Sequence, residues 1–133
     1  MVESCVFDSN ALLKLFQEEE GYQRVTKILR DLKASGGLAL MNAINYAEII
    51  YITKRFLGDQ RKIECLAAIE LLGIKILPVP TELIIRSAEY KGEFSISYAD
   101  CFVLASAIEH KAAVVTGDDE FKKVEHLVRI VWV

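Results

Sequence analysis

Four acidic residues stand beside or inside apolar segments of the chain: Asp8, Glu48, Asp100 and Asp118. Asp8 directly follows the apolar run 5–7, and Asp118 comes just after the run 113–116. Glu48 and Asp100 lie in segments with helical spacing, on faces that are mostly apolar and carry no Lys or Arg. Burying a carboxylate is unfavourable unless something pairs with it, and a bound cation would be such a partner.

Carboxylates without His or Cys companions favour hard cations, so the predicted ligand is Mg²⁺ or Mn²⁺, as one or two ions. Such ions polarise phosphate esters and activate water, which points to phosphoryl chemistry. Each acid also has a purely structural alternative. Asp8 fits a helix N-cap, Asp118 fits a turn, and Glu48 fits a solvated helix position. Ser97 and Asp100 fit a capping box, in which the Asp100 carboxylate accepts from the Ser97 amide.

The apolar pattern predicts the elements that would position these acids. Short apolar runs predict strands over 3–7, 38–41, 74–79, 113–116 and 128–133. Helical spacing predicts helices over 9–34 with a break near Gly21, and over 43–57, 60–72, 81–92, 97–110 and 119–126. In the helix 60–72, one apolar stripe contains Ile63, Leu66, Ala67 and Leu71.

Strands that alternate with helices predict an α/β fold with a mainly parallel sheet of about five strands. The strands are continuous apolar runs, as expected when helices cover both faces of the sheet. Ligands of such sheets bind beyond the carboxyl ends of the strands. The four acids are expected to meet at that edge, since the helix 97–110 must begin there in order to run back to the strand 113–116.

Composition fits one domain spanning 1–133. The chain has 133 residues, of which 53% are hydrophobic, and a formal net charge of −3. This charge argues against a strongly basic nucleic-acid binder but not against a nuclease whose acids are neutralised by metal. The absence of a long apolar stretch and of a signal-peptide pattern predicts a cytoplasmic protein without membrane spans. Three dispersed cysteines in apolar runs, Cys5, Cys65 and Cys101, are expected to be structural.

Three longer segments carry a resemblance to a known family. They are VFDSNALLKLF at 6–16, NAINYAEIIY at 42–51 and SISYADCFVLASAIEHKAAVVTGDDEFKKV at 95–124. With the closing strand, they resemble PIN domains, and most closely the VapC-like ribonuclease toxins of toxin–antitoxin pairs. The resemblance implies a three-layer α/β/α fold. It also implies Mg²⁺- or Mn²⁺-dependent hydrolysis of RNA that leaves 5′-phosphate and 3′-hydroxyl ends.

The same resemblance implies roles for individual residues. The family's four acids fall on Asp8, Glu48, Asp100 and Asp118. Glu48 is open between holding metal and acting on the attacking water. Residues implied to orient the acids by hydrogen bonds are Ser9, Asn10 and Thr116. Arg86 and Lys91 precede the Asp100 segment and are candidate RNA contacts. Implied protein partners are a small antitoxin and a second copy, as a homodimer or a dimer of dimers, with apolar helical surface around Ile49, Ile52 and Phe56.

Other protein classes fit less well. A PIN nuclease of RNA processing or decay, without an antitoxin, stays an alternative, and so does a non-catalytic PIN-like binding or scaffold module. A response-regulator receiver needs an Asp after its third strand, whereas the third strand here ends in Pro78-Val79-Pro80. The glycine motifs of P-loop and dinucleotide-binding proteins are missing.

Overall fold

A computed structural model of the chain describes residues 3–133, so the first two residues of the expected domain lie outside the described part. Its centre is a five-stranded sheet in the order β3-β2-β1-β4-β5, in which neighbouring strands are parallel. The strands are β1 (Cys5–Phe7), β2 (Ala39–Asn42), β3 (Lys75–Leu77), β4 (Ala113–Thr116) and β5 (Ile130–Trp132). The predicted parallel α/β sheet is therefore confirmed.

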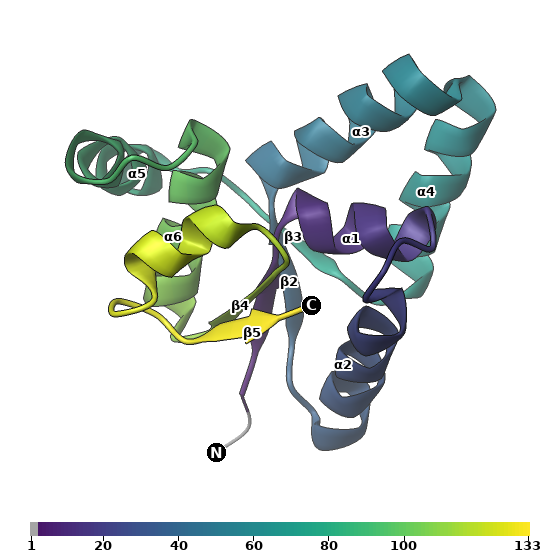
Figure 1. The fold of residues 1–133 in the computed structure, drawn as a ribbon, viewed down its shortest axis with the longest axis horizontal. Helices are drawn as coiled ribbons and strands as arrows, with labels where there is room; N and C mark the ends of the chain where they lie inside the picture. Colours follow the sequence, from purple (N-terminus) through teal and green to yellow (C-terminus); the bar gives the residue numbers. More distant parts are fainter. Residues whose placement is uncertain (1–2) are drawn as a thin grey trace.

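Helices connect successive strands, as the sequence predicts (Figure 1). They are α1 (Ser9–Phe16), α2 (Tyr22–Ser35), α3 (Ala43–Leu57), α4 (Asp59–Leu71), α5 (Thr81–Glu93), α6 (Tyr98–His110) and the 3₁₀ helix η1 (Asp119–Val124). The expected break near Gly21 separates α1 from α2. Gly36 ends α2 in the left-handed conformation, with φ of 80°, which a glycine adopts without strain. Each helix within residues 3–133 is too short or too polar to cross a lipid bilayer.

Two apolar layers cover the two faces of the sheet. Side chains alternate along a strand, so Phe7 points to one face and Val6 to the other. Phe7 packs with α1, α2 and the buried residues Ile49 of α3 and Ile69 of α4. Val6 packs instead with α6 and η1 (Figure 1). The arrangement confirms the predicted three-layer α/β/α architecture.

Two expectations about helix faces are wrong. In α4, Ile63 is 56% exposed and Leu71 is 88% exposed, whereas Cys65 and Ile69 form the buried face. This helix has apolar residues on more than one side, so spacing alone did not identify the side that packs. Ile49, placed on an exposed apolar surface of α3, is fully buried in the core.

The strand order creates a switch point between β1 and β4. From β1 the chain moves outward through β2 to β3, and then crosses back to β4 on the other side of β1. Connections on the two sides therefore leave the sheet in opposite directions, which opens a crevice at the carboxyl edge. Asp8 follows β1, and Thr116 ends β4, so both residues lie at this point.

Candidate active site

Asp8 is the most deeply buried of the four predicted acids. It is 2% exposed and caps α1, because its Oδ1 accepts from the Ala11 amide at 2.8 Å. Its other oxygen, Oδ2, accepts the hydroxyl proton of Thr116. The Thr116 Oγ1 in turn accepts from the Asp118 amide at 3.0 Å. One threonine at the end of β4 therefore fixes the positions of two of the predicted acids.

The turn after β4 is held by Asn10. The Gly117 amide donates to the Asn10 Oδ1 at 2.9 Å. A Cβ on Gly117 would stand 2.8 Å from the Val133 carbonyl oxygen and would contact the Lys14 amine, so the turn has no space for a side chain. Asp118 then begins η1 by accepting the Glu120 amide at 2.9 Å. Asn10 and Thr116, two of the residues expected to orient the acids, thus both hydrogen-bond to the turn that carries Asp118.

Asp100 lies at the start of α6 with an unpaired oxygen. The Ser97 Oγ accepts from the Asp100 amide at 3.1 Å, so the predicted serine cap is present. The predicted capping box also requires the Asp100 carboxylate to accept from the Ser97 amide. This part of the prediction is wrong, because the Ser97 amide donates to the Glu120 Oε2, at 3.2 Å. Within residues 3–133, the buried Asp100 Oδ2 has no hydrogen-bond partner. One oxygen each from Asp100, Asp118 and Glu120 lie within 4.8 Å of one another.

Glu48 reaches the site from α3. Its Oε1 accepts the Ser9 hydroxyl at 2.9 Å, which links α3 to the beginning of α1. Asn45, one turn earlier, accepts the Ser9 amide at 3.2 Å and donates to the Ala99 carbonyl at 3.4 Å. Asn45 is fully buried and connects α1, α3 and the start of α6. Sequence reasoning missed it as a site residue, although an amide on the apolar face that carries Glu48 was a usable signal.

Burial is the main cause of the raised pKa values of three of these acids. Burial raises the pKa of Asp8 to about 7, against the opposing hydrogen bonds from Thr116 and Ala11, and the negative charges of Asp118 and Glu48 add to the rise. Burial likewise raises the pKa of Asp100 to about 7, with further increases from the charges of Asp8 and Asp118. The pKa of Glu48 is also raised by burial. Neighbouring buried carboxylates are difficult to ionise at the same time, because their negative charges repel one another. A bound cation would offset this repulsion.

The sequence matches the family model of the PIN domain over residues 5–127. The chain belongs to the PIN domain family. The match contains all four acids that the sequence analysis selected and most of the sheet. No curated protein matches the chain.

Solved PIN structures share its fold. The structure of VapBC2 from Rickettsia felis, bound to a DNA fragment from its promoter, superposes with a TM-score of 0.76 at 17% identity and covers 96% of each chain. DNA-bound VapBC from Salmonella typhimurium gives 0.75 at 16% identity, with 97% of each chain covered. VapC20 of Mycobacterium tuberculosis, a toxin that cleaves the sarcin-ricin loop, gives 0.74 at 15% identity and covers 91% of this chain and 95% of its own. At these identities the likeness establishes the fold.

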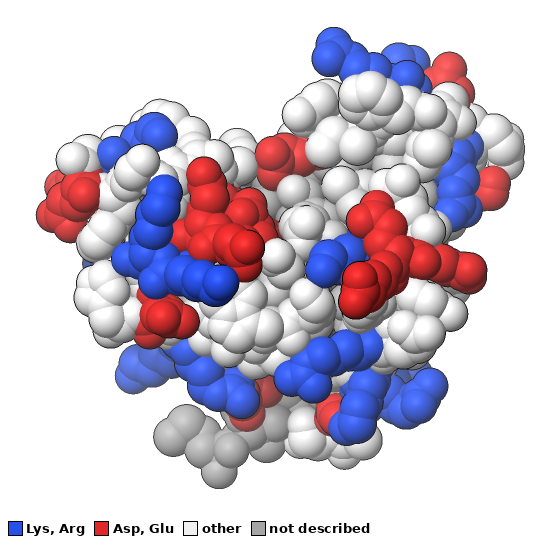
Figure 2. Space-filling model, in the orientation of Figure 1, with Lys and Arg blue, Asp and Glu red and all other residues white. Residues whose placement is uncertain are grey.

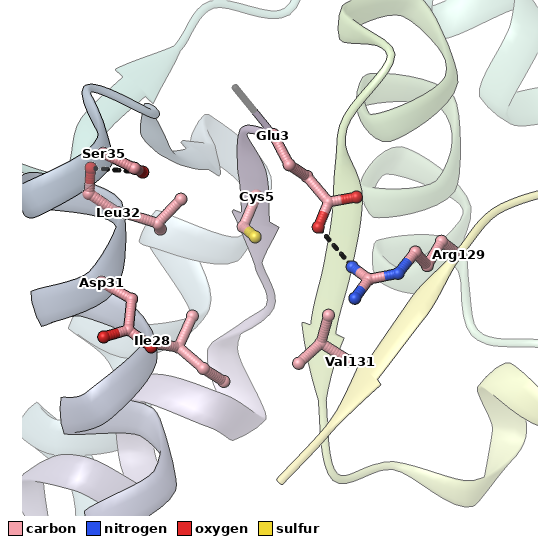
Figure 3. Close-up of a pocket in the computed structure, with 8 residues that line it drawn as sticks. All are labelled: Glu3, Cys5, Ile28, Asp31, Leu32, Ser35, Arg129 and Val131. Carbon is pink, nitrogen blue, oxygen red and sulfur yellow. Dashed lines mark hydrogen bonds and ion pairs between the residues drawn. The ribbon is translucent and has the colours of Figure 1, made fainter. Parts of the chain in front are cut away.

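A separate hollow of about 420 Å³ lies at the amino ends of the strands, opposite the acids of this PIN fold (Figure 3). Arg129 and Glu3 form an ion pair on one side of it, and Cys5 lies at its base (Figure 3). Burial raises the pKa of the Cys5 thiol to about 11, so the thiol is protonated at neutral pH. All three cysteines are free and buried, as expected for structural residues.

The surface at the acid site carries both charges. Figure 2 shows a hollow between the α3–α4 side and the α6–η1 side, with acidic side chains over η1 and basic ones beside them. Lys122 and Lys123 belong to η1. Of the two expected RNA contacts, Arg86 is exposed on α5, whereas the Lys91 amine donates to the Ile96 carbonyl at 2.7 Å and supports the loop before α6.

Proposed function

We propose that this protein is a Mg²⁺- or Mn²⁺-dependent endoribonuclease and the toxin of a VapBC-type toxin–antitoxin pair. The observation that carries the proposal is the buried, unpaired oxygen of Asp100, a residue whose carboxylate lies close to those of Asp118 and Glu120, in a chain of the PIN family. A buried oxygen that is left without a hydrogen-bond donor destabilises a protein by about 1–3 kcal/mol, and by more when the group is charged. A divalent cation is the partner that fits an all-oxygen donor set.

The chain's own residues would divide the work. Asp8, Asp100 and Asp118 would hold the ion or ions directly or through water, and Glu48 would hold metal or orient the attacking water. The bound cation would supply a Lewis acid for the phosphodiester. Hydrogen bonds of Thr116 hold Asp8 and Asp118 in position, and the Ser9 hydroxyl donates to Glu48. Hydrolysis by water would leave a 5′-phosphate and a 3′-hydroxyl, with Arg86 and Lys91 as proposed contacts for the RNA backbone.

Cleavage of labelled single-stranded RNA tests the activity. Wild-type protein should cleave with Mg²⁺ or Mn²⁺ and not with EDTA, and Asp8→Asn and Asp100→Asn should abolish cleavage. Asp119→Asn is the matched control, because Asp119 is adjacent to Asp118 but its side chain is 85% exposed and pairs with Lys122, at 3.3 Å. This control should cleave as wild type. Equal cleavage by wild type and both site variants would contradict the site assignment, and absence of both cleavage and metal binding would favour the scaffold alternative.

The protein partners need separate tests. An antitoxin gene is expected beside the gene of this protein, encoding a small DNA-binding protein that copurifies with it and blocks cleavage. Failure of any neighbouring small protein to bind would favour an RNA-processing nuclease without antitoxin. We also propose one domain acting in the cytoplasm as a homodimer or a dimer of dimers, through apolar surface at the end of α3, where Phe56 is 71% exposed. A monomer at micromolar concentration in light scattering would contradict self-association.

A further inference from the structure

Tyr98 is an exposed aromatic residue at the end of α6 that lies beside the acids. It is the first residue of this helix and comes two positions before Asp100. Residues two apart on a helix point to different sides, so the tyrosine ring is not one of the groups around the carboxylates. The residue is 48% exposed, which leaves a large part of an apolar ring in contact with solvent at the edge of the site.

Phe102 supports the ring of Tyr98 from one turn further along α6. The two rings are stacked, with centroids 5.7 Å apart and an interplanar angle of 24°. Phe102 is only 8% exposed and forms a small buried cluster with Leu83 and Ala105. One face of the Tyr98 ring therefore rests on a residue that core packing holds in place, and the exposed surface of the ring is available to a further planar group.

The stacked rings lie where α6 meets α3. Asn45 of α3 donates to the Ala99 carbonyl at 3.4 Å, which joins the two helices at the first turn of α6. Ile44, in the first turn of α3, packs against the cluster that contains Phe102. Figure 2 shows the hollow over the acids between the α3–α4 side and the α6–η1 side. Tyr98 thus presents its ring beside this hollow, at the same end of the sheet as the carboxylates.

A ring in this position can supply affinity for RNA that the charges of the protein do not. The formal net charge is −3, so general electrostatic attraction to a phosphate backbone is weak. Stacking of a base on an aromatic side chain does not depend on the charge of the protein. The bases of a double helix are already stacked on one another, so only an unpaired base is free to lie on the ring.

We propose that Tyr98, supported by Phe102, stacks on an unpaired nucleobase next to the phosphodiester that is cleaved. The substrate is then an RNA whose cleavage site is single-stranded, in a loop or an unpaired segment. The inference rests on the proposed ribonuclease function and adds a substrate-binding residue to it. Every base has a face that can stack, so this contact selects unpaired RNA rather than one base over another.

Binding of short single-stranded RNAs tests this role. Each RNA carries one 2-aminopurine, placed at every position in turn, and the fluorescence of this base falls when it stacks. Binding is measured in Ca²⁺, which also takes oxygen ligands, so that it is followed separately from Mg²⁺-dependent cleavage. Wild type should quench the fluorescence at one or two positions. Tyr98→Leu keeps an apolar side chain without a ring, so it should abolish the quenching and weaken binding by about 5-fold or more.

Matched variants separate stacking from a structural effect. Tyr98→Phe and Tyr98→Trp retain a ring and should bind and quench as wild type does. Tyr22→Leu is the control at another position, because Tyr22 is also the first residue of its helix, but α2 covers the other face of the sheet. This control should bind RNA as wild type. Tyr98→Leu should keep the wild-type affinity for Mn²⁺, measured by calorimetry, since the acids are unchanged.

The possible outcomes distinguish this inference from the proposed function. Wild-type RNA binding by Tyr98→Leu overturns the inference and leaves the exposed ring to a contact with a protein partner. An equal loss of binding in Tyr98→Phe also overturns it, because the ring is still present in that variant. If wild type binds RNA through Tyr98 but does not cleave it in Mg²⁺, the proposed catalytic function fails and the stacking role stands. A wild-type protein that binds no RNA refutes both.

Discussion

Replacing Asp100 with Asn should stabilise the metal-free protein while abolishing its response to metal. The Asp100 carboxylate is buried, has an unpaired oxygen and has a pKa of about 7 in the folded state. An Asp in an unfolded chain has a pKa of about 4, so ionised Asp100 destabilises the fold at pH 8 by at most about 4 kcal/mol. Water and side-chain movement at the edge of the site reduce this figure. We expect a gain of about 2 kcal/mol, which corresponds to roughly 5–10 °C in melting temperature.

The pH dependence of this gain has a defined sign. Because the pKa of Asp100 is raised in the folded state, its destabilising effect is largest when the carboxylate is ionised, above pH 7, and decreases as the folded state takes up a proton below that pH. The stability gain of Asp100→Asn should therefore fall to about a third when the pH is lowered from 8 to 5. A gain that is equal at both pH values would point to better packing rather than to removal of a charge.

The assay is thermal and urea unfolding followed by circular dichroism, at pH 5 and pH 8, in EDTA and in Mn²⁺. Wild type should gain about 2.7 kcal/mol when Mn²⁺ is present at 100 times its dissociation constant, whereas Asp100→Asn should gain little. Asp119→Asn controls for the loss of one acidic charge on the same side of the molecule. The reasoning is refuted if Asp100→Asn is less stable than wild type at pH 8 in EDTA, or if Mn²⁺ stabilises it as much as wild type.

Three further outcomes are expected from the hydrogen bonds and the raised pKa values of the site. Thr116→Val removes the hydroxyl that donates to Asp8 and accepts from the Asp118 amide. Urea unfolding should show a loss of stability of about 1–3 kcal/mol. Calorimetry should show a Mn²⁺ affinity at least about 10-fold weaker than that of wild type. Asn45→Ala leaves the Ser9 amide without its acceptor. The free energy of unfolding in urea should fall by about 1–3 kcal/mol, and RNA cleavage should be slower. Unchanged stability would show that Asn45 does not hold α1 and α3 together. Metal-free wild type should become less stable from pH 5 to pH 8, because the raised pKa values of Asp8 and Asp100 make their ionisation unfavourable in the folded state. The affinity for Mn²⁺ should rise over the same pH range. A stability in EDTA that does not change with pH would argue against the raised pKa values.

The elements were predictable because strands and helices differ clearly in this sequence. Strands are short, continuous apolar runs, and the predicted segments 43–57 and 113–116 coincide with α3 and β4. The inward face of α4 was not predictable, because the helix carries apolar residues on several sides and only tertiary packing selects Cys65 and Ile69. The same ambiguity placed Ile49 on the surface, whereas packing against the sheet buries it.

The candidate site was predictable where a residue follows a strand. Asp8 and Thr116 are placed by the ends of β1 and β4, so a parallel sheet brings them together once the strands are identified. Asn45 and Glu120 were missed because their partners are far away in the sequence. Asn45 accepts from a residue 36 positions earlier, and Glu120 accepts from one 23 positions earlier. Glu120 also lies in a run of acids that looks like an ordinary solvated turn.

The start of α6 shows how a capping pattern and a metal-binding pattern can coexist. Asp100 is three residues after Ser97, where a carboxylate gains from the partial positive charge of the helix N-terminus. In a complete capping box, the Asp100 carboxylate would accept a hydrogen bond from the Ser97 amide and would be less available to a cation. Glu120 supplies the acceptor instead, from the segment that also carries Asp118. The helix therefore retains its serine cap and the favourable field at its first turn, while the Asp100 carboxylate stays free for a ligand.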